Sequence, residues 1–128
     1  MAAIKQSGIN QQTINPIYFC PLIDARRMEV FTAIYDKNLK IILEPTAKIV
    51  DENSFDNYLK EYNILFSGNG VTKLKTVVEN SNASYTSVQH SAIHLSYLAE
   101  QYFNKKMFAN LAYSEPFYLK AFFSPIKR

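Results

Sequence analysis

Largely apolar runs broken by short polar corners over residues 17–45 predict three consecutive strands. Ile17–Asp24 and Glu29–Asp36 are rich in β-branched and aromatic residues, and the polar corner between them is too short for anything but a reversal. Asp36-Lys37-Asn38 makes a second tight turn before Leu39–Glu44, because Asp and Asn tolerate the backbone conformations of such turns. Strands joined by short turns form an antiparallel meander, and we expect Pro45 to end or bend the third strand.

Beyond this meander the apolar positions recur with the period of helices, interrupted by short apolar runs. Asp51 or Asn53 can cap a first helix, a short strand is predicted at Ile64-Leu65-Phe66, and Tyr85–Val88 is a further strand candidate. The apolar stripes of the three predicted helices are Phe55, Leu59 and Tyr62; Leu74, Val77 and Val78; and, in a helix from Ser91 to Asn104, Leu95, Leu98, Ala99 and Tyr102.

This order of elements predicts an α/β fold with a mixed sheet, in which an antiparallel three-strand meander is followed by parallel strands covered by helices. That is the ribonuclease-H-like arrangement, which is also the lobe of the actin-like ATPase superfamily. Ile17–Asp24 is apolar on both faces, as a central strand is, although Pro21 favours a bulge or a free edge there. Fold order alone does not fix function.

Length and charge set broad limits on function. At 128 residues and 14.7 kDa the chain fits one domain, which we place at residues 16–128. A net charge of +3, spread along the chain, requires neither a nucleic acid nor a membrane as partner. The single cysteine, Cys20, excludes an internal disulfide framework and suits a reducing compartment. Since no apolar run is long enough to span a bilayer, a cytoplasmic protein is the default expectation.

Residues 1–15 are predicted to hold the end of a helix followed by a linker. Met1–Gln6 contains good helix formers and is followed by Gly8, but no capping residue precedes it. Two readings stay open: this is the last turn of a truncated longer helix, or it is a short terminal turn that frays.

Gly68-Asn69-Gly70 lies between a predicted strand and a helix, where exposed amides could hold a phosphate or a nucleotide. The alternative is a tight turn that uses glycine for its permissive backbone. We favour the turn, because the sequence lacks both the third glycine of the dinucleotide fingerprint and the Lys-Ser/Thr of the P-loop.

No catalytic or metal-binding set can be assembled from the sequence. His90 and His94 are four residues apart, but no neighbouring Cys, Asp or Glu completes a ligand set. Cys20 lies among apolar residues with no adjacent histidine, so core packing is its expected role. Neither a Gly-x-Ser-x-Gly elbow nor a specific Ser/His/Asp arrangement is present.

Asp24, Arg26, Arg27 and Glu29 cluster at the predicted tip of the first hairpin. In one reading the guanidinium groups engage phosphate or a partner's carboxylate, a geometry that arginine suits. In the other, Asp24 and Arg26 pair and stiffen their own turn. Composition leaves both readings open.

The same hairpin carries a family resemblance. Ile23-Asp24-Ala25-Arg26-Arg27-Met28-Glu29-Val30-Phe31, followed by Ala33-Ile34-Tyr35, closely resembles the D-A-R-x-x-E-V-Y signature of the TsaB (YeaZ) family. Leu43-Glu44-Pro45, Phe66–Gly70 and Glu115–Lys120 resemble further family segments in the same order. The resemblance spans about residues 16–120, with Gln89-His90 in place of the small or proline-bearing start of the family's last helix.

This resemblance implies an actin-like protein of two lobes, of which the chain looks like the second. Family members are non-catalytic paralogues of the tRNA threonylcarbamoyl transferase TsaD, and names such as glycoprotease or peptidase-like come from that paralogue. Together with TsaD and the ATPase TsaE they support synthesis of threonylcarbamoyladenosine (t6A) in tRNA, which implies only indirect contact with tRNA. The alternative is a fragment of an actin-fold, nucleotide-dependent kinase or hydrolase.

Two departures limit what the resemblance implies. In nucleotide-binding relatives the first hairpin of the second lobe is a Gly-rich phosphate loop, whereas Asp24-Ala25-Arg26-Arg27 carries bulky side chains. We therefore expect no cofactor in this chain, with ATP or ADP bound only in the full complex. The family's main TsaD contact uses first-lobe helices, so a second lobe alone should bind TsaD poorly. A further hypothesis is a homo-oligomer formed through apolar surface on Ile4 or Phe122-Phe123.

Overall fold

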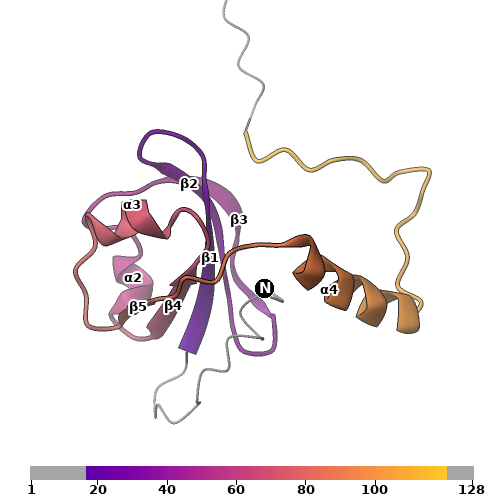
Figure 1. Ribbon diagram of the computed structural model, residues 1–128, viewed down its shortest axis with the longest axis horizontal. Helices are drawn as coiled ribbons and strands as arrows, with labels where there is room; N and C mark the ends of the chain where they lie inside the picture. The colour runs from indigo at the N-terminus through magenta and orange to yellow at the C-terminus, as the bar shows by residue number, and fades with distance from the viewer. Residues whose placement is uncertain (1–16, 121–128) are drawn as a thin grey trace, which may run out of the picture.

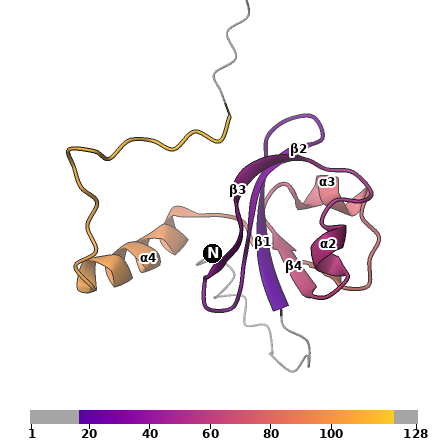
Figure 2. The same cartoon turned by 180° about the vertical axis from the view of Figure 1, so that it is seen from behind.

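A computed structural model describes residues 17–120 of the chain. A five-stranded sheet forms its centre, with the short helices α2 and α3 on one side, while α4 extends from the other side (Figure 1). Figure 2 shows the same division from behind. The elements in chain order are β1 (Ile17–Asp24), β2 (Glu29–Tyr35), β3 (Ile41–Ile49), α2 (Asp56–Leu59), β4 (Asn63–Ser67), α3 (Val71–Lys75), β5 (Ala83–Tyr85) and α4 (Ala92–Asn104).

The first strand of the chain is the central strand of the sheet, whose order is β3-β2-β1-β4-β5. β1 pairs with β2, and β2 with β3, in antiparallel fashion, whereas the β1–β4 and β4–β5 pairs are parallel. The predicted fold class, an α/β ribonuclease-H-like lobe with a mixed sheet, is confirmed. Because β1 and β4 are parallel neighbours, their carboxyl ends meet at one edge, which brings the β1–β2 turn beside the loop that follows β4.

One face of the sheet forms the core against α2 and α3. β1 is central, as predicted, but its two faces are not equally covered, since Cys20 and Leu22 are completely buried whereas Ile23 is exposed. Phe66 of β4 lies in the middle of this core and contacts the rings of Phe55 and Tyr85. The largest fully buried side chains are Phe66, Leu22, Ile34, Leu59, Ile64, Leu74, Val30 and Cys20.

The expectation for Pro21 is wrong, and of the two outcomes expected at Pro45, an end or a bend of the strand, the end is wrong. Pro21 lies in the central strand, and the β1–β2 register is the same on both sides of it, so it causes neither a bulge nor a free edge. The hydroxyl of Thr32 donates to the Pro21 carbonyl at 3.0 Å and helps to satisfy the backbone there. The third strand does not end at Pro45 but continues to Ile49. β3 is an edge strand with register shifts near this position, and an edge tolerates a residue that cannot donate.

The predicted helices exist, but each differs from expectation. α3 ends at Lys75, so Val77 and Val78 of its predicted stripe lie beyond the helix. α2 is a single turn that begins after Phe55, whose φ of 70° interrupts the helical path predicted from Asp51 or Asn53. α4 has its predicted extent, yet its stripe is not buried: none of its residues is, and Leu95 and Tyr102 are 67% and 54% exposed. Amphipathic spacing identified this helix but did not determine what covers it.

Several sequence expectations lie outside the described residues, namely the helix end and linker at 1–15 and the apolar surface on Ile4 and Phe122-Phe123. Between residues 17 and 120, no helix is both long enough and apolar enough to cross a membrane.

Candidate functional site

Two turns meet where the carboxyl ends of β1 and β4 lie side by side. The first joins Asp24 to Glu29, and the second contains Gly68-Asn69-Gly70. The Asn69 side-chain oxygen accepts a hydrogen bond from the Asp24 amide at 2.9 Å, and the Gly70 amide donates to the Leu22 carbonyl at 3.1 Å. The two groups of candidate residues identified in the sequence are therefore parts of one site.

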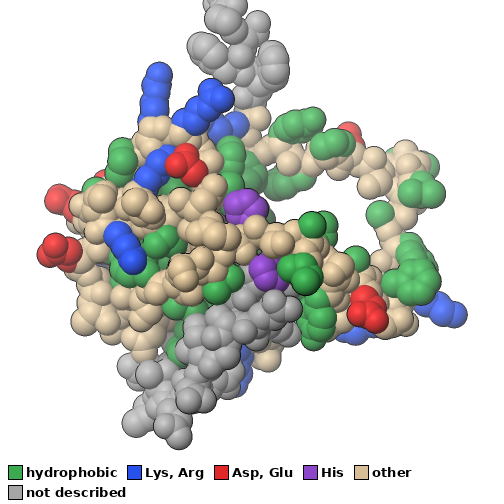
Figure 3. Space-filling model, viewed as in Figure 1, with side chains coloured by type: hydrophobic (Ala, Val, Ile, Leu, Met, Phe, Trp, Pro, Cys, Tyr) green, Lys and Arg blue, Asp and Glu red, His purple; other side chains and the backbone are tan. Residues whose placement is uncertain are grey.

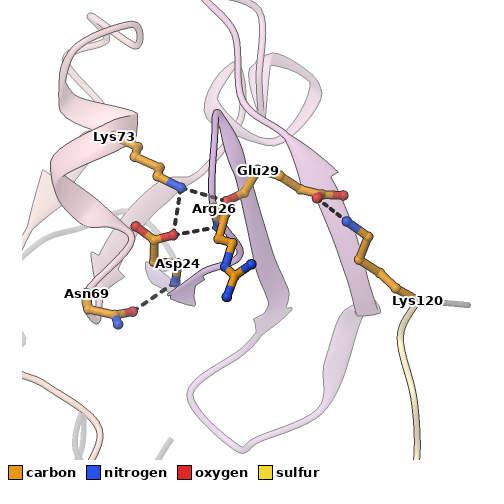
Figure 4. A network of polar contacts seen from close by, with 6 residues as sticks. All are labelled: Asp24, Arg26, Glu29, Asn69, Lys73 and Lys120. Carbon is orange, nitrogen blue, oxygen red and sulfur yellow. Dashed lines mark hydrogen bonds and ion pairs between the residues drawn. The ribbon is translucent and has the colours of Figure 1, made fainter. Parts of the chain in front are cut away.

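Lys73, from α3, holds the first hairpin closed. Its ammonium group donates to the Asp24 carboxylate at 2.7 Å and to the Glu29 backbone carbonyl at 3.1 Å, so it bridges the end of β1 and the start of β2 (Figure 4). The Asp24 carboxylate also accepts the Arg26 amide at 2.7 Å. These contacts, the bond from Lys73 first, lower the pKa of Asp24 below its ordinary value. Asp24 is therefore a structural anchor of the turn.

Both acids of the hairpin are paired with lysines, and neither is paired with Arg26 or Arg27. Glu29 forms an ion pair with Lys120, which lies far along the chain, and Asp24 forms one with Lys73. The side-chain pair that one reading placed between Asp24 and Arg26 is not formed, because only the Arg26 backbone contacts Asp24. The guanidinium groups of Arg26 and Arg27 are exposed and make no hydrogen bond or ion pair with residues 17–120.

The turn itself is closed by two backbone hydrogen bonds. The Ala25 amide donates to the Glu29 carbonyl at 3.0 Å, and the Glu29 amide donates to the Arg26 carbonyl at 3.1 Å. Closing the chain in this way places Arg26 at φ 67° and Arg27 at φ 46°, in the left-handed region. The two arginines thus project from a turn whose shape is fixed by its neighbours.

The glycine loop is packed against β1. Gly68 has φ +98°, and a Cβ built on it would lie 2.3 Å from the Leu22 carbonyl oxygen, so no side chain fits. The amides of Gly68 and Gly70 donate to the carbonyls of Val88 and Leu22. Because both glycine amides are used within the fold, this geometry favours the tight turn over a phosphate-holding loop.

The remaining candidates stay apart. His90 precedes α4 while His94 lies within it, so the two do not share a helical face. Within the described part of the chain, no group of three His, Cys, Asp or Glu side chains is arranged to hold a metal ion. Cys20 is completely buried with its sulfur 3.1 Å from the Thr32 hydroxyl, and burial raises the pKa of its thiol to about 12. This thiol is therefore expected to be inert.

Sequence reasoning missed Lys73 as a member of this site and did not anticipate that Lys120 pairs with Glu29. The available signal for Lys73 was its place three residues after Gly70, in the first turn of a helix that starts beside the hairpin. Only the parallel pairing of β1 with β4 shows that this turn faces Asp24.

Comparison with known proteins supports the fold. Neither a protein-family model nor a curated protein matches the sequence. Among solved structures, the chain is similar to an uncharacterized protein with similarity to peptidase YeaZ from Pseudomonas aeruginosa, with a TM-score of 0.63 and 17% identity. The fold is YeaZ-like. The match covers 92% of this chain and 53% of the other, so the chain spans about half the length of that YeaZ-like protein.

Proposed function

We propose that this chain is the second lobe of a TsaB-type scaffold subunit, which supports t6A synthesis in tRNA without catalysing a reaction itself. The observation that carries the proposal is the Asp24–Glu29 hairpin. The residues that resemble the family signature form the turn between the two central antiparallel strands of a YeaZ-like sheet. The proposed partners are TsaD and TsaE, with tRNA bound by the complex and not by this chain.

The geometry of the hairpin supports a role in contact with proteins more than a role in chemistry. Asp24 is held by Lys73 and Asn69, so the polar groups around the turn are engaged in contacts within the chain. Asp24 and Glu29 are each paired with a lysine (Figure 4), whereas the side chains of Arg26 and Arg27 are exposed. A rigid turn that presents two exposed guanidinium groups suits recognition of a partner.

Depletion of the gene that encodes this chain in its own host tests the proposal. The ratio of t6A to adenosine in bulk tRNA, measured by mass spectrometry, should fall several-fold and should recover when the gene is restored on a plasmid. A copy carrying Phe66→Asp should not restore the ratio, because a charge in the centre of the core prevents folding. A t6A content that does not change on depletion would contradict the proposed function.

A further inference from the structure

The two arginines of the hairpin occupy backbone positions at which other residues are favoured. Turns with φ above zero at successive positions normally use Gly, Asn or Asp, because a longer side chain crowds the backbone there. Here Arg26 has φ 67° and Arg27 has φ 46°. Strained conformations of this kind cluster at functional sites, and here two of them follow each other, with exposed side chains, at the tip of one turn.

The electrostatic surroundings leave both guanidinium groups available. The nearby acids are already neutralised, Asp24 by Lys73 and Glu29 by Lys120. Lys and Arg side chains gather at the end of the sheet where this turn projects (Figure 3). The tip therefore has an excess of positive charge that no carboxylate of residues 17–120 balances.

We propose that Arg26 and Arg27 are a docking site for the carboxylates of an acidic surface on a protein partner. Two guanidinium groups on a fixed turn match a pair of carboxylates, which arginine binds through two parallel hydrogen bonds. A nucleic acid is the weaker candidate, because phosphate backbones are bound by extended basic surfaces. Here the nearby Lys73 and Lys120 are already engaged with acids of the chain itself.

A titration tests the site directly and does not depend on the proposed function. The chain contains three arginines, Arg26, Arg27 and Arg128, so the Nε signals in a ¹⁵N-labelled sample are few and the third is an internal control. Hexaglutamate should shift the signals of Arg26 and Arg27 at least twofold more than that of Arg128. Equal shifts of all three would overturn the proposal. Tighter binding of hexathymidylate than of hexaglutamate would overturn it in favour of nucleic acid.

Substitution by glycine removes the two arginine side chains without destabilising the fold, so that a loss of function can be assigned to the side chains. Arg26→Gly/Arg27→Gly removes the guanidinium groups and also relieves the positive φ, so its melting temperature should equal or exceed that of the wild type by up to roughly 5 °C. Lys106→Gly is a matched control, because Lys106 is also an exposed cation with positive φ (54°) and lies at the end of α4, away from the hairpin. It too should not lower the melting temperature.

The rescue assay described above then serves as the second readout, and this arm rests on the proposed function. The double glycine variant should restore less than half of the wild-type t6A content, whereas Lys106→Gly should restore all of it. Full rescue by the double variant would overturn the docking role. If depletion itself leaves t6A unchanged, the proposed function fails, and the hexaglutamate titration still decides whether the hairpin binds carboxylates.

Discussion

Replacement of Gly68 by alanine tests how the glycine loop is joined to the hairpin. Gly68 has φ +98°, and an added Cβ would lie 2.3 Å from the Leu22 carbonyl oxygen, closer than a Cβ approaches another atom in real structures. That carbonyl accepts the Gly70 amide, so relieving the overlap displaces an existing hydrogen bond. The substitution therefore strains the loop and loosens its attachment to β1.

The magnitude follows from these two terms. A residue other than glycine in such a backbone conformation costs about 1–3 kcal/mol, and a lost backbone hydrogen bond costs about 1 kcal/mol. Gly68→Ala should therefore lower the free energy of unfolding by about 2–4 kcal/mol. Domains of this size have a stability of roughly 5–15 kcal/mol, so the variant should still fold.

Gly70→Ala is the matched control, because its position has an ordinary φ of −81°. Its added Cβ would meet the side chains of Leu22 and Val30 at 3.0 Å, a tight contact for which a small shift compensates. We expect the tight contact to lower the free energy of unfolding by about 1 kcal/mol. The lower conformational entropy of the unfolded alanine chain offsets part of this loss. Urea unfolding followed by circular dichroism measures both variants. This reasoning would be refuted if Gly68→Ala lowered the free energy of unfolding by less than about 1 kcal/mol. It would also be refuted if Gly70→Ala lowered it by more than Gly68→Ala does.

Three further predictions concern other parts of the molecule. Iodoacetamide at pH 8 should leave Cys20 unmodified in the native protein and alkylate it fully in urea, because burial raises the pKa of the thiol to about 12; rapid native alkylation would count against this. Lys73 keeps the pKa of Asp24 below its usual 3.8, so the carboxylate stabilises the folded state above that pH and this contribution is lost as the pH falls through the folded-state pKa. Asp24→Asn should accordingly lower the melting temperature at pH 7 but not in strong acid, and an equal effect at both pH values would exclude this role. Leu74→Ala should lower the free energy of unfolding in urea by about 2–5 kcal/mol, because Leu74 is fully buried. Leu95→Ala, at a position that is 67% exposed, should lower it by less than about 0.5 kcal/mol, and similar losses for the two variants would show that α4 is packed.

The first two strands could be predicted closely because their signal is local, whereas β5 (Ala83–Tyr85) shares only Tyr85 with the strand predicted at Tyr85–Val88. β1 has the predicted bounds, and β2 differs by a single residue at its end, since both follow from runs of β-branched and aromatic residues next to polar turns. The order of strands and helices then restricted the topology to few choices. The fold class was therefore within reach of the sequence.

Contacts between segments that are distant along the chain could not be predicted from the sequence. Lys73 and Lys120 pair with acids of the hairpin that lie far away along the chain, and no periodic pattern encodes such a pair. The stripe of α4 has helical spacing, but whether it is covered depends on what packs against it. Pro45 indicated that the third strand ends or bends, and an edge position allowed β3 to continue past it with a shifted register. In each case tertiary position decided what the local pattern left open.

Nucleotide binding by the purified chain tests most directly whether it works by contacting partner proteins and not as a nucleotide-dependent enzyme. Because the Gly68 and Gly70 amides and the Asp24 carboxylate are engaged within the fold, calorimetric titration with magnesium ATP and magnesium ADP should show no saturable binding up to about 1 mM. Saturable binding with a micromolar dissociation constant would contradict the account and favour a nucleotide-dependent enzyme.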